Sequence, residues 1–190
     1  MKIAVLALQG DFAEHRKKLE ECGAETFEIR QKKDIMTEFD GLVLPGGEST
    51  VIGKLLHELD IYDILKEKIE AGMPVFATCA GMILLAEKIE NDDKVHFGTM
   101  HMTVKRNAYG RQLGSFRTDA AVKGLGEVPM TFIRAPYIAD TNGAEVLAYV
   151  EGKAVAAREG NQVALAFHPE LDENNDIYRY WLDIVKNYKK

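Results

Sequence analysis

The strongest constraint on the fold is residues 73–86, which read MPVFATCAGMILLA. A short apolar run leads into Cys79, small residues flank the cysteine, and a helix-forming apolar run follows at once. This order is typical of a nucleophile elbow, where a strand turns sharply into a helix and presents one side chain at the tip. The free N–H groups of the helix start favour a thiolate there. Cys79 is therefore a candidate nucleophile, although most lone cysteines pack as small hydrophobic residues.

Strand and helix patterns alternate over the first half of the chain. Apolar runs predict strands, and amphipathic runs predict helices, in the order 2–8, 11–21, 25–29, 42–44, 51–58, 62–71 and 75–78. This rhythm favours a parallel sheet with helices on both faces. The predicted fold class is α/β: a three-layer α/β/α arrangement with a mainly parallel, flavodoxin-like central sheet.

The second half changes to short strands separated by turns, and residues 90–94 suggest a solvated loop. We expect a smaller, partly antiparallel set of strands, followed by a C-terminal helix; their predicted ranges are 96–105, 131–133, 145–151, 154–158, 163–168 and, for the helix, 177–188. No linker or repeat separates the halves. A length of 190 residues with 46% hydrophobic residues suits a single domain over 1–190.

A second motif, His168-Pro169-Glu170, ends an apolar run near the C-terminus. In an extended chain the side chains of residues i and i+2 point the same way, so Glu170 is expected beside His168. Pro169 also favours an extended backbone at His168. A carboxylate that orients an imidazole, which takes a thiol proton, is the logic of a catalytic triad. Each residue alone would more readily be structural; together with the elbow they indicate catalysis.

A third motif is the loop Pro45-Gly46-Gly47 between a strand and a helix, with Ser49 or Thr50 as the expected N-cap. Two glycines allow backbone N–H groups to face a ligand, as an oxyanion hole requires. A phosphate site is the weaker interpretation, because the lysine of a P-loop and the dinucleotide spacing are both missing. All three motifs follow strands, so we expect them at the carboxyl edge of the sheet.

Taken together, the three motifs resemble class I glutamine amidotransferases. Four further strings narrow the resemblance to the glutaminase subunits of pyridoxal 5′-phosphate synthases: Leu-Gln-Gly at 8–10, Pro-Gly-Gly-Glu-Ser-Thr at 45–50, Arg-Asn-Ala-Tyr-Gly-Arg-Gln at 106–112 and Phe-Ile-Arg-Ala-Pro at 132–136. The resemblance covers essentially the whole chain.

This resemblance implies hydrolysis of L-glutamine to glutamate and ammonia through a cysteine thioester. It implies a partner, a (β/α)₈-barrel synthase that receives the ammonia and builds the cofactor from a pentose phosphate and a triose phosphate, and it implies neither a metal nor a cofactor in this chain. The implied catalytic residues are Cys79, His168 and Glu170, with an oxyanion hole from the N–H groups of Gly47 and Ala80. The implied glutamine contacts are Gln9, Gly46, Gly47, Glu48, Ser49, Arg106, Ile133 and Arg134.

Composition excludes several other classes. A net charge of −6 argues against a nucleic-acid surface. No apolar stretch is long enough to span a bilayer, the N-terminus reads as a strand, and two cysteines give no disulfide framework, so we expect a cytoplasmic protein.

Several alternatives remain open at this stage. They are the glutaminase of another amidotransferase, a cysteine hydrolase of γ-glutamyl bonds, an inactive structural partner and a non-catalytic flavodoxin-like binding module. A receiver-type module would need acidic residues at its strand ends, whereas these ends carry Gln9, Gly46 and Cys79. Only tests of substrates would separate the hydrolases.

Overall fold

Five parallel strands form the centre of the computed structural model, which describes residues 1–106 and 114–188. Their order across the sheet is β2 (Glu25–Ile29), β1 (Lys2–Leu6), β3 (Gly41–Leu44), β4 (Val75–Thr78) and β12 (Gln162–Leu165). Every residue of β3 and β4 is buried, as expected for parallel strands that are covered on both faces.

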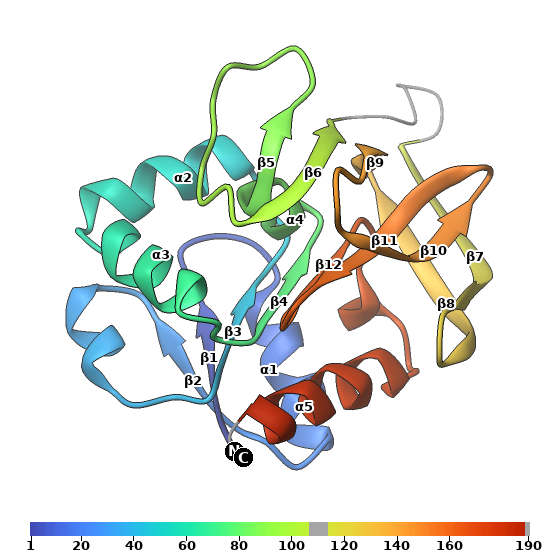
Figure 1. Cartoon of the computed structure of the whole chain (residues 1–190). Helices are drawn as coiled ribbons and strands as arrows, with labels where there is room; N and C mark the ends of the chain where they lie inside the picture. The colour runs from blue at the N-terminus through green and yellow to red at the C-terminus, as the bar shows by residue number, and fades with distance from the viewer. Residues whose placement is uncertain (107–113, 189–190) are drawn as a thin grey trace.

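Helices cover both faces of this sheet (Figure 1). One layer contains α1 (Phe12–Glu21) and α5 (Asp176–Tyr188), and the other contains α2 (Ser49–Glu58), α3 (Tyr62–Glu70) and α4 (Ala80–Leu85). On β4 the ring of Phe76 packs against Tyr178 and Trp181 of α5, with ring centroids 5.1 and 5.5 Å apart. The predicted α/β class with a mainly parallel central sheet is confirmed. Within the described part of the chain, no helix has the length and apolar character needed to cross a membrane.

The second half extends the sheet beyond β12, on the right in Figure 1. Antiparallel neighbours follow in the order β11 (Lys153–Glu159), β10 (Glu145–Val150), β7 (Ser115–Val122) and β8 (Gly126–Ile133). A branch contains β5 (Ala86–Ile89), β6 (Met100–Lys105) and β9 (Tyr137–Asp140), and two 3₁₀ turns, η1 (Lys32–Met36) and η2 (Pro169–Leu171), complete the elements. The predicted partly antiparallel set is therefore present.

Several predicted boundaries were wrong. The strands predicted at 2–8 and 163–168 end earlier, at Leu6 and Leu165, because the apolar run in each case continues into the loop that carries site residues. Helix α2 begins at Ser49, so Glu48 occupies the N-cap position predicted for Ser49 or Thr50. The strands β5, β7 and β9 were not predicted. In β7, seven of the eight residues are exposed or only half-buried, so the apolar signal is weak.

Candidate active site

Cys79 occupies the sharp turn between β4 and α4, as the elbow pattern predicts. Its backbone has φ +48° and ψ −101°, a strained conformation for a residue other than glycine. Its N–H donates to the carbonyl oxygen of Leu165 at 2.8 Å, which ties the turn to the end of β12. The turn also needs Gly81, because a Cβ there would lie 2.1 Å from the carbonyl oxygen of Leu44. Neighbouring strands therefore hold the elbow in place.

His168 lies three residues beyond β12, in contact with two other elements. Its backbone N–H donates to the carbonyl oxygen of Thr131 at 2.8 Å, and its φ of −110° and ψ of 83° lie outside the α region, which the following proline disfavours. Its ring Nδ1 lies 2.7 Å from Oε1 of Glu170. The side chains meet as predicted, but the predicted reason was wrong: Pro169 begins the 3₁₀ turn η2, so Glu170 is not on an extended strand.

The buried pair is electrostatically coupled. Burial disfavours the charged imidazole, yet interactions with the Cys79 thiol and with Glu170 outweigh it and raise the pKa of His168 to about 10. Burial likewise raises the pKa of Glu170, but nearby histidines reverse this and the net pKa is lowered. Within the described residues, Nε2 of His168 is buried and has no hydrogen-bond partner of good geometry. The site thus favours an ionised carboxylate beside an imidazole that holds its proton.

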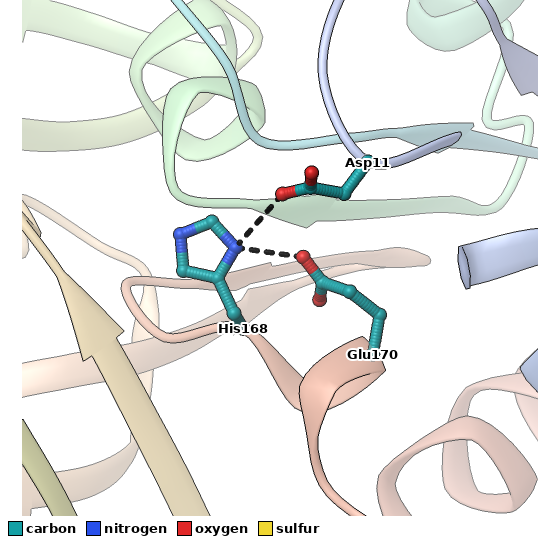
Figure 2. A group of neighbouring side chains, drawn as sticks. All are labelled: Asp11, His168 and Glu170. Carbon is teal, nitrogen blue, oxygen red and sulfur yellow. Dashed lines mark hydrogen bonds and ion pairs between the residues drawn. The ribbon is translucent and has the colours of Figure 1, made fainter. Parts of the chain in front are cut away.

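Asp11 is a site residue that sequence analysis did not identify. Figure 2 shows its carboxylate and that of Glu170 both directed at the ring of His168, with Oδ2 of Asp11 3.7 Å from Nδ1. Asp11 precedes α1 at the N-cap position, where aspartate is common, but its side chain makes no capping hydrogen bond. Donor atoms of the three residues lie within 4.8 Å of one another, close enough for a cation. Because Glu170 already engages Nδ1 at 2.7 Å, we interpret the group as part of a proton-transfer site.

The Pro-Gly-Gly loop lies directly against the two candidate catalytic side chains. A Cβ on Gly46 would lie 2.6 Å from Cε1 of His168 and 3.5 Å from Cβ of Cys79, so only glycine fits there. Gly47 adopts φ +143°, and the next N–H, that of Glu48, donates to Oε1 of Gln9 at 2.7 Å. The side chain of Gln9 therefore restrains the loop at Glu48.

A pocket of about 230 Å³ opens beside Cys79. It is lined by Gln9, Asp11, Gly47, Glu48, Cys79, Ile133, Arg134 and His168. Five of the eight glutamine contacts implied by the resemblance line this pocket: Gln9, Gly47, Glu48, Ile133 and Arg134.

The other implied residues are not in the lining of this pocket. Gly46 packs beneath His168, and Ser49 is buried as the first residue of α2. Ala80 begins α4, directly after the nucleophile. Arg106 forms an ion pair with Asp92, with Nη2 and Oδ2 2.9 Å apart. The rest of the Arg-Asn-Ala-Tyr-Gly-Arg-Gln motif, 107–112, lies outside the described residues.

Replacing Gly10 by alanine tests how tightly this site is packed. Its Cα lies against the loop, and an added Cβ would be 1.7 Å from the carbonyl oxygen of Gly46. Gly23 is a matched control, since it also has a positive φ (+83° against +94°) but has open space around it. We expect Gly23→Ala to lower the free energy of unfolding by about 1–2 kcal/mol. Gly10→Ala should cost about 1–3 kcal/mol more, from overpacking. Equal losses in urea unfolding would contradict the packing described.

Comparisons with known proteins agree on one family. The profile of the SNO glutamine amidotransferase family matches residues 5–187. A protein of Desulfitobacterium hafniense (strain Y51) named pyridoxal 5′-phosphate synthase subunit PdxT is 54% identical over 190 residues, covering 100% of this chain and 96% of the relative. A protein of the same name from Haemophilus influenzae (strain PittEE) is 52% identical, covering 98% and 99%. A crystal structure described as a glutamine amidotransferase has a TM-score of 0.91 at 42% identity, covering 97% and 98%.

Proposed function

Since this chain belongs to the SNO glutamine amidotransferase family, we propose that it is the glutaminase subunit of a pyridoxal 5′-phosphate synthase and that Cys79 is its nucleophile. Two relatives that carry a synthase-subunit name are at least 52% identical over nearly the whole chain, which supports this assignment. The observation that carries the proposal is the pocket that joins Cys79, at a strained elbow, to His168 and its carboxylate partner Glu170.

The reaction follows from the chemistry of these groups. The sulfur of Cys79 attacks the side-chain amide carbon of glutamine, while His168 holds the proton and then transfers it to the departing ammonia. A glutamyl thioester remains on Cys79. Water, activated by His168, then hydrolyses the thioester and releases glutamate. Glu170 orients the imidazole through the 2.7 Å contact at Nδ1.

Each tetrahedral intermediate carries an oxyanion that needs hydrogen-bond donors. We assign these to the backbone N–H groups of Gly47, in the pocket lining, and Ala80, directly after the nucleophile. Loss of one such donor typically costs about 2.7–4 kcal/mol of transition-state stabilisation. The Gln9 hydrogen bond to the next N–H along the loop constrains how the Gly47 peptide can turn.

The charges at the pocket mouth suit a zwitterionic amino acid. Arg134 and Glu48 are both exposed and both line the pocket. The guanidinium of Arg134 can bind an α-carboxylate with two hydrogen bonds, and Glu48 can bind an α-ammonium group. Arg106 and Ser49 are not part of this lining.

Free ammonia in neutral water is mostly protonated and no longer nucleophilic, so a shielded transfer is required. We propose that a (β/α)₈-barrel synthase docks over the pocket mouth and receives the ammonia in the cytoplasm. Ile133, which lines this pocket, is an apolar side chain that is 37% exposed. Docking beside Gln9 can turn the Gly46-Gly47 peptide, since glycines allow such a change at little steric cost.

Glutamate release from glutamine, measured with and without the synthase, tests this function. The isolated chain should hydrolyse glutamine feebly, and a saturating amount of synthase should activate it strongly. Glutamine should tighten the complex of Cys79→Ala protein with the synthase. Full activity without the partner would contradict the coupling, and preferential hydrolysis of γ-glutamyl peptides would favour the hydrolase alternative.

A further inference from the structure

A second buried histidine lies beneath the active site, on α1, and the mechanism above does not use it. His15 is 0% exposed. Its Nε2 lies 3.1 Å from Oγ1 of Thr78, the residue before the nucleophile, and 3.4 Å from Oε2 of Glu170. Its Nδ1 lies 2.9 Å from the hydroxyl of Tyr178 on α5. One imidazole thus joins the end of β4, the turn η2 and two helices.

The contacts of His15 determine which ring nitrogen carries the proton. Within the described residues, Oε2 of Glu170 makes no hydrogen bond of standard geometry, so a buried anionic oxygen faces Nε2. A lone pair on Nε2 would repel that oxygen, whereas an N–H would attract it. The phenol of Tyr178 can donate to Nδ1, and this leaves Nε2 as the protonated nitrogen. The Nε2–H then donates to Oγ1 of Thr78 at 3.1 Å, and Oε2 of Glu170, 3.4 Å from Nε2, is held by the longer electrostatic contact.

Near the pKa of His168, His15 acts as a dipole rather than as a charge. Burial lowers its pKa, and nearby His168 lowers it further, against the opposing effect of Glu170, Asp11 and Glu14. Burial also raises the pKa of Tyr178, so its hydroxyl keeps its proton. At the pH where His168 titrates, His15 is therefore neutral. Its removal takes away a hydrogen-bond donor and no positive charge.

We propose that His15, held by Tyr178, is a positioning residue that keeps the Glu170 carboxylate aimed at Nδ1 of His168 and holds the elbow through Thr78. The carboxylate of Glu170 needs a second contact because Nδ1 of His168 contacts only one of its oxygens, Oε1, at 2.7 Å. With the other oxygen unsupported, Glu170 can rotate away and the imidazole loses its orientation. This inference rests on the glutaminase function proposed above, because it assigns a role within that triad.

The test compares three variants of the full chain with the synthase present. His15→Leu removes both ring nitrogens, His15→Gln keeps a donor where Nε2–H lies, and Tyr178→Phe removes only the hydroxyl. We expect His15→Leu to lower kcat about 10-fold, with little change in KM. This is the low end of the loss seen when a residue that hydrogen-bonds to a metal ligand is removed, a comparable positioning role. His15→Gln should recover most of the rate, and Tyr178→Phe should fall between wild type and His15→Leu.

A second readout does not depend on turnover. The titration of the His168 imidazole can be followed by NMR, with its signal assigned by comparison with His168→Asn. Its midpoint reports whether the Glu170 carboxylate stays in contact with Nδ1. The groups that face this ring are Cys79 on the elbow, Asp11 before α1, Glu170 on η2 and His15 itself. In His15→Leu the midpoint should fall by about one pH unit from its wild-type value, because a misplaced carboxylate stabilises the imidazolium less.

The two readouts separate the possible failures. An inactive wild type would remove the proposed glutaminase function, and the NMR shift would still decide the role of His15. Equal loss of activity in His15→Leu and His15→Gln, with an unshifted His168 midpoint, would reduce His15 to a packing residue. An upward shift in His15→Leu would mean that His15 acts as a cation. Either result would overturn the proposal.

Discussion

Cys79→Ala should abolish release of glutamate from glutamine while the protein stays folded. Without the sulfur no thioester can form, and loss of a nucleophile in a triad typically lowers kcat by about 10³-fold or more. The fold should tolerate the change, because the elbow is held by backbone contacts: the residue 79 N–H to Leu165, and Gly81 against Leu44. Alanine is also no larger than cysteine. The measurements are glutamate release with the synthase present and urea unfolding.

Cys22→Ala is the matched control for this variant. Cys22 is the other free cysteine, half-buried at the end of α1 and outside the pocket lining. The Cys22→Ala variant should keep wild-type turnover. It should also stay sensitive to iodoacetamide, because the thiol of Cys22 should not account for that inhibition. Retained hydrolysis in Cys79→Ala at more than a trace, or equal loss in both variants, would remove Cys79 from the mechanism.

The parts of the site that sequence analysis predicted are those that depend on local sequence. The elbow could be recognised because its tight turn demands small residues on both sides of Cys79, and Gly81 shows why: there is no room for a side chain. Gly46 is a similar case, since its neighbours leave no space for a Cβ. The contact of His168 with Glu170 was also predicted, although from an extended strand rather than from the 3₁₀ turn that produces it.

The residues that were missed are those defined by contacts distant in sequence. In the sequence, Asp11 has the pattern of an ordinary residue at a helix start. The fold brings it to His168, which lies 157 positions later in the chain. His15 is separated in the same way from Thr78 and Tyr178, by 63 and 163 positions. The spacing of His15 from Phe12 and Leu19 along a helix predicts only an inward-facing residue. Contacts of this kind are defined by the tertiary structure, and the local patterns of a single sequence do not predict them.

His168→Asn should be about as damaging as Cys79→Ala, because the imidazole lines the pocket beside Cys79 and is the group that we propose holds the proton of the thiol and delivers it to ammonia. Asparagine keeps the backbone N–H that donates to Thr131, so the fold should persist. It has no titrating nitrogen, so the group whose pKa is raised to about 10 is lost. Glu170→Gln should be milder, since the imidazole remains and loses only the carboxylate that orients it.

The double variant Cys79→Ala/His168→Asn tests whether the two residues act together. Residues that work as one unit are not additive, so the double variant should be no slower than the slower single variant. If the two losses instead multiplied, each residue would contribute to an independent step, and the proton could not be passed from the thiol to His168. Gly46 explains why one unit is expected: its missing side chain leaves the sulfur-bearing Cβ of Cys79 and the His168 ring facing the same small space. Within that space, removal of either partner already removes the reaction.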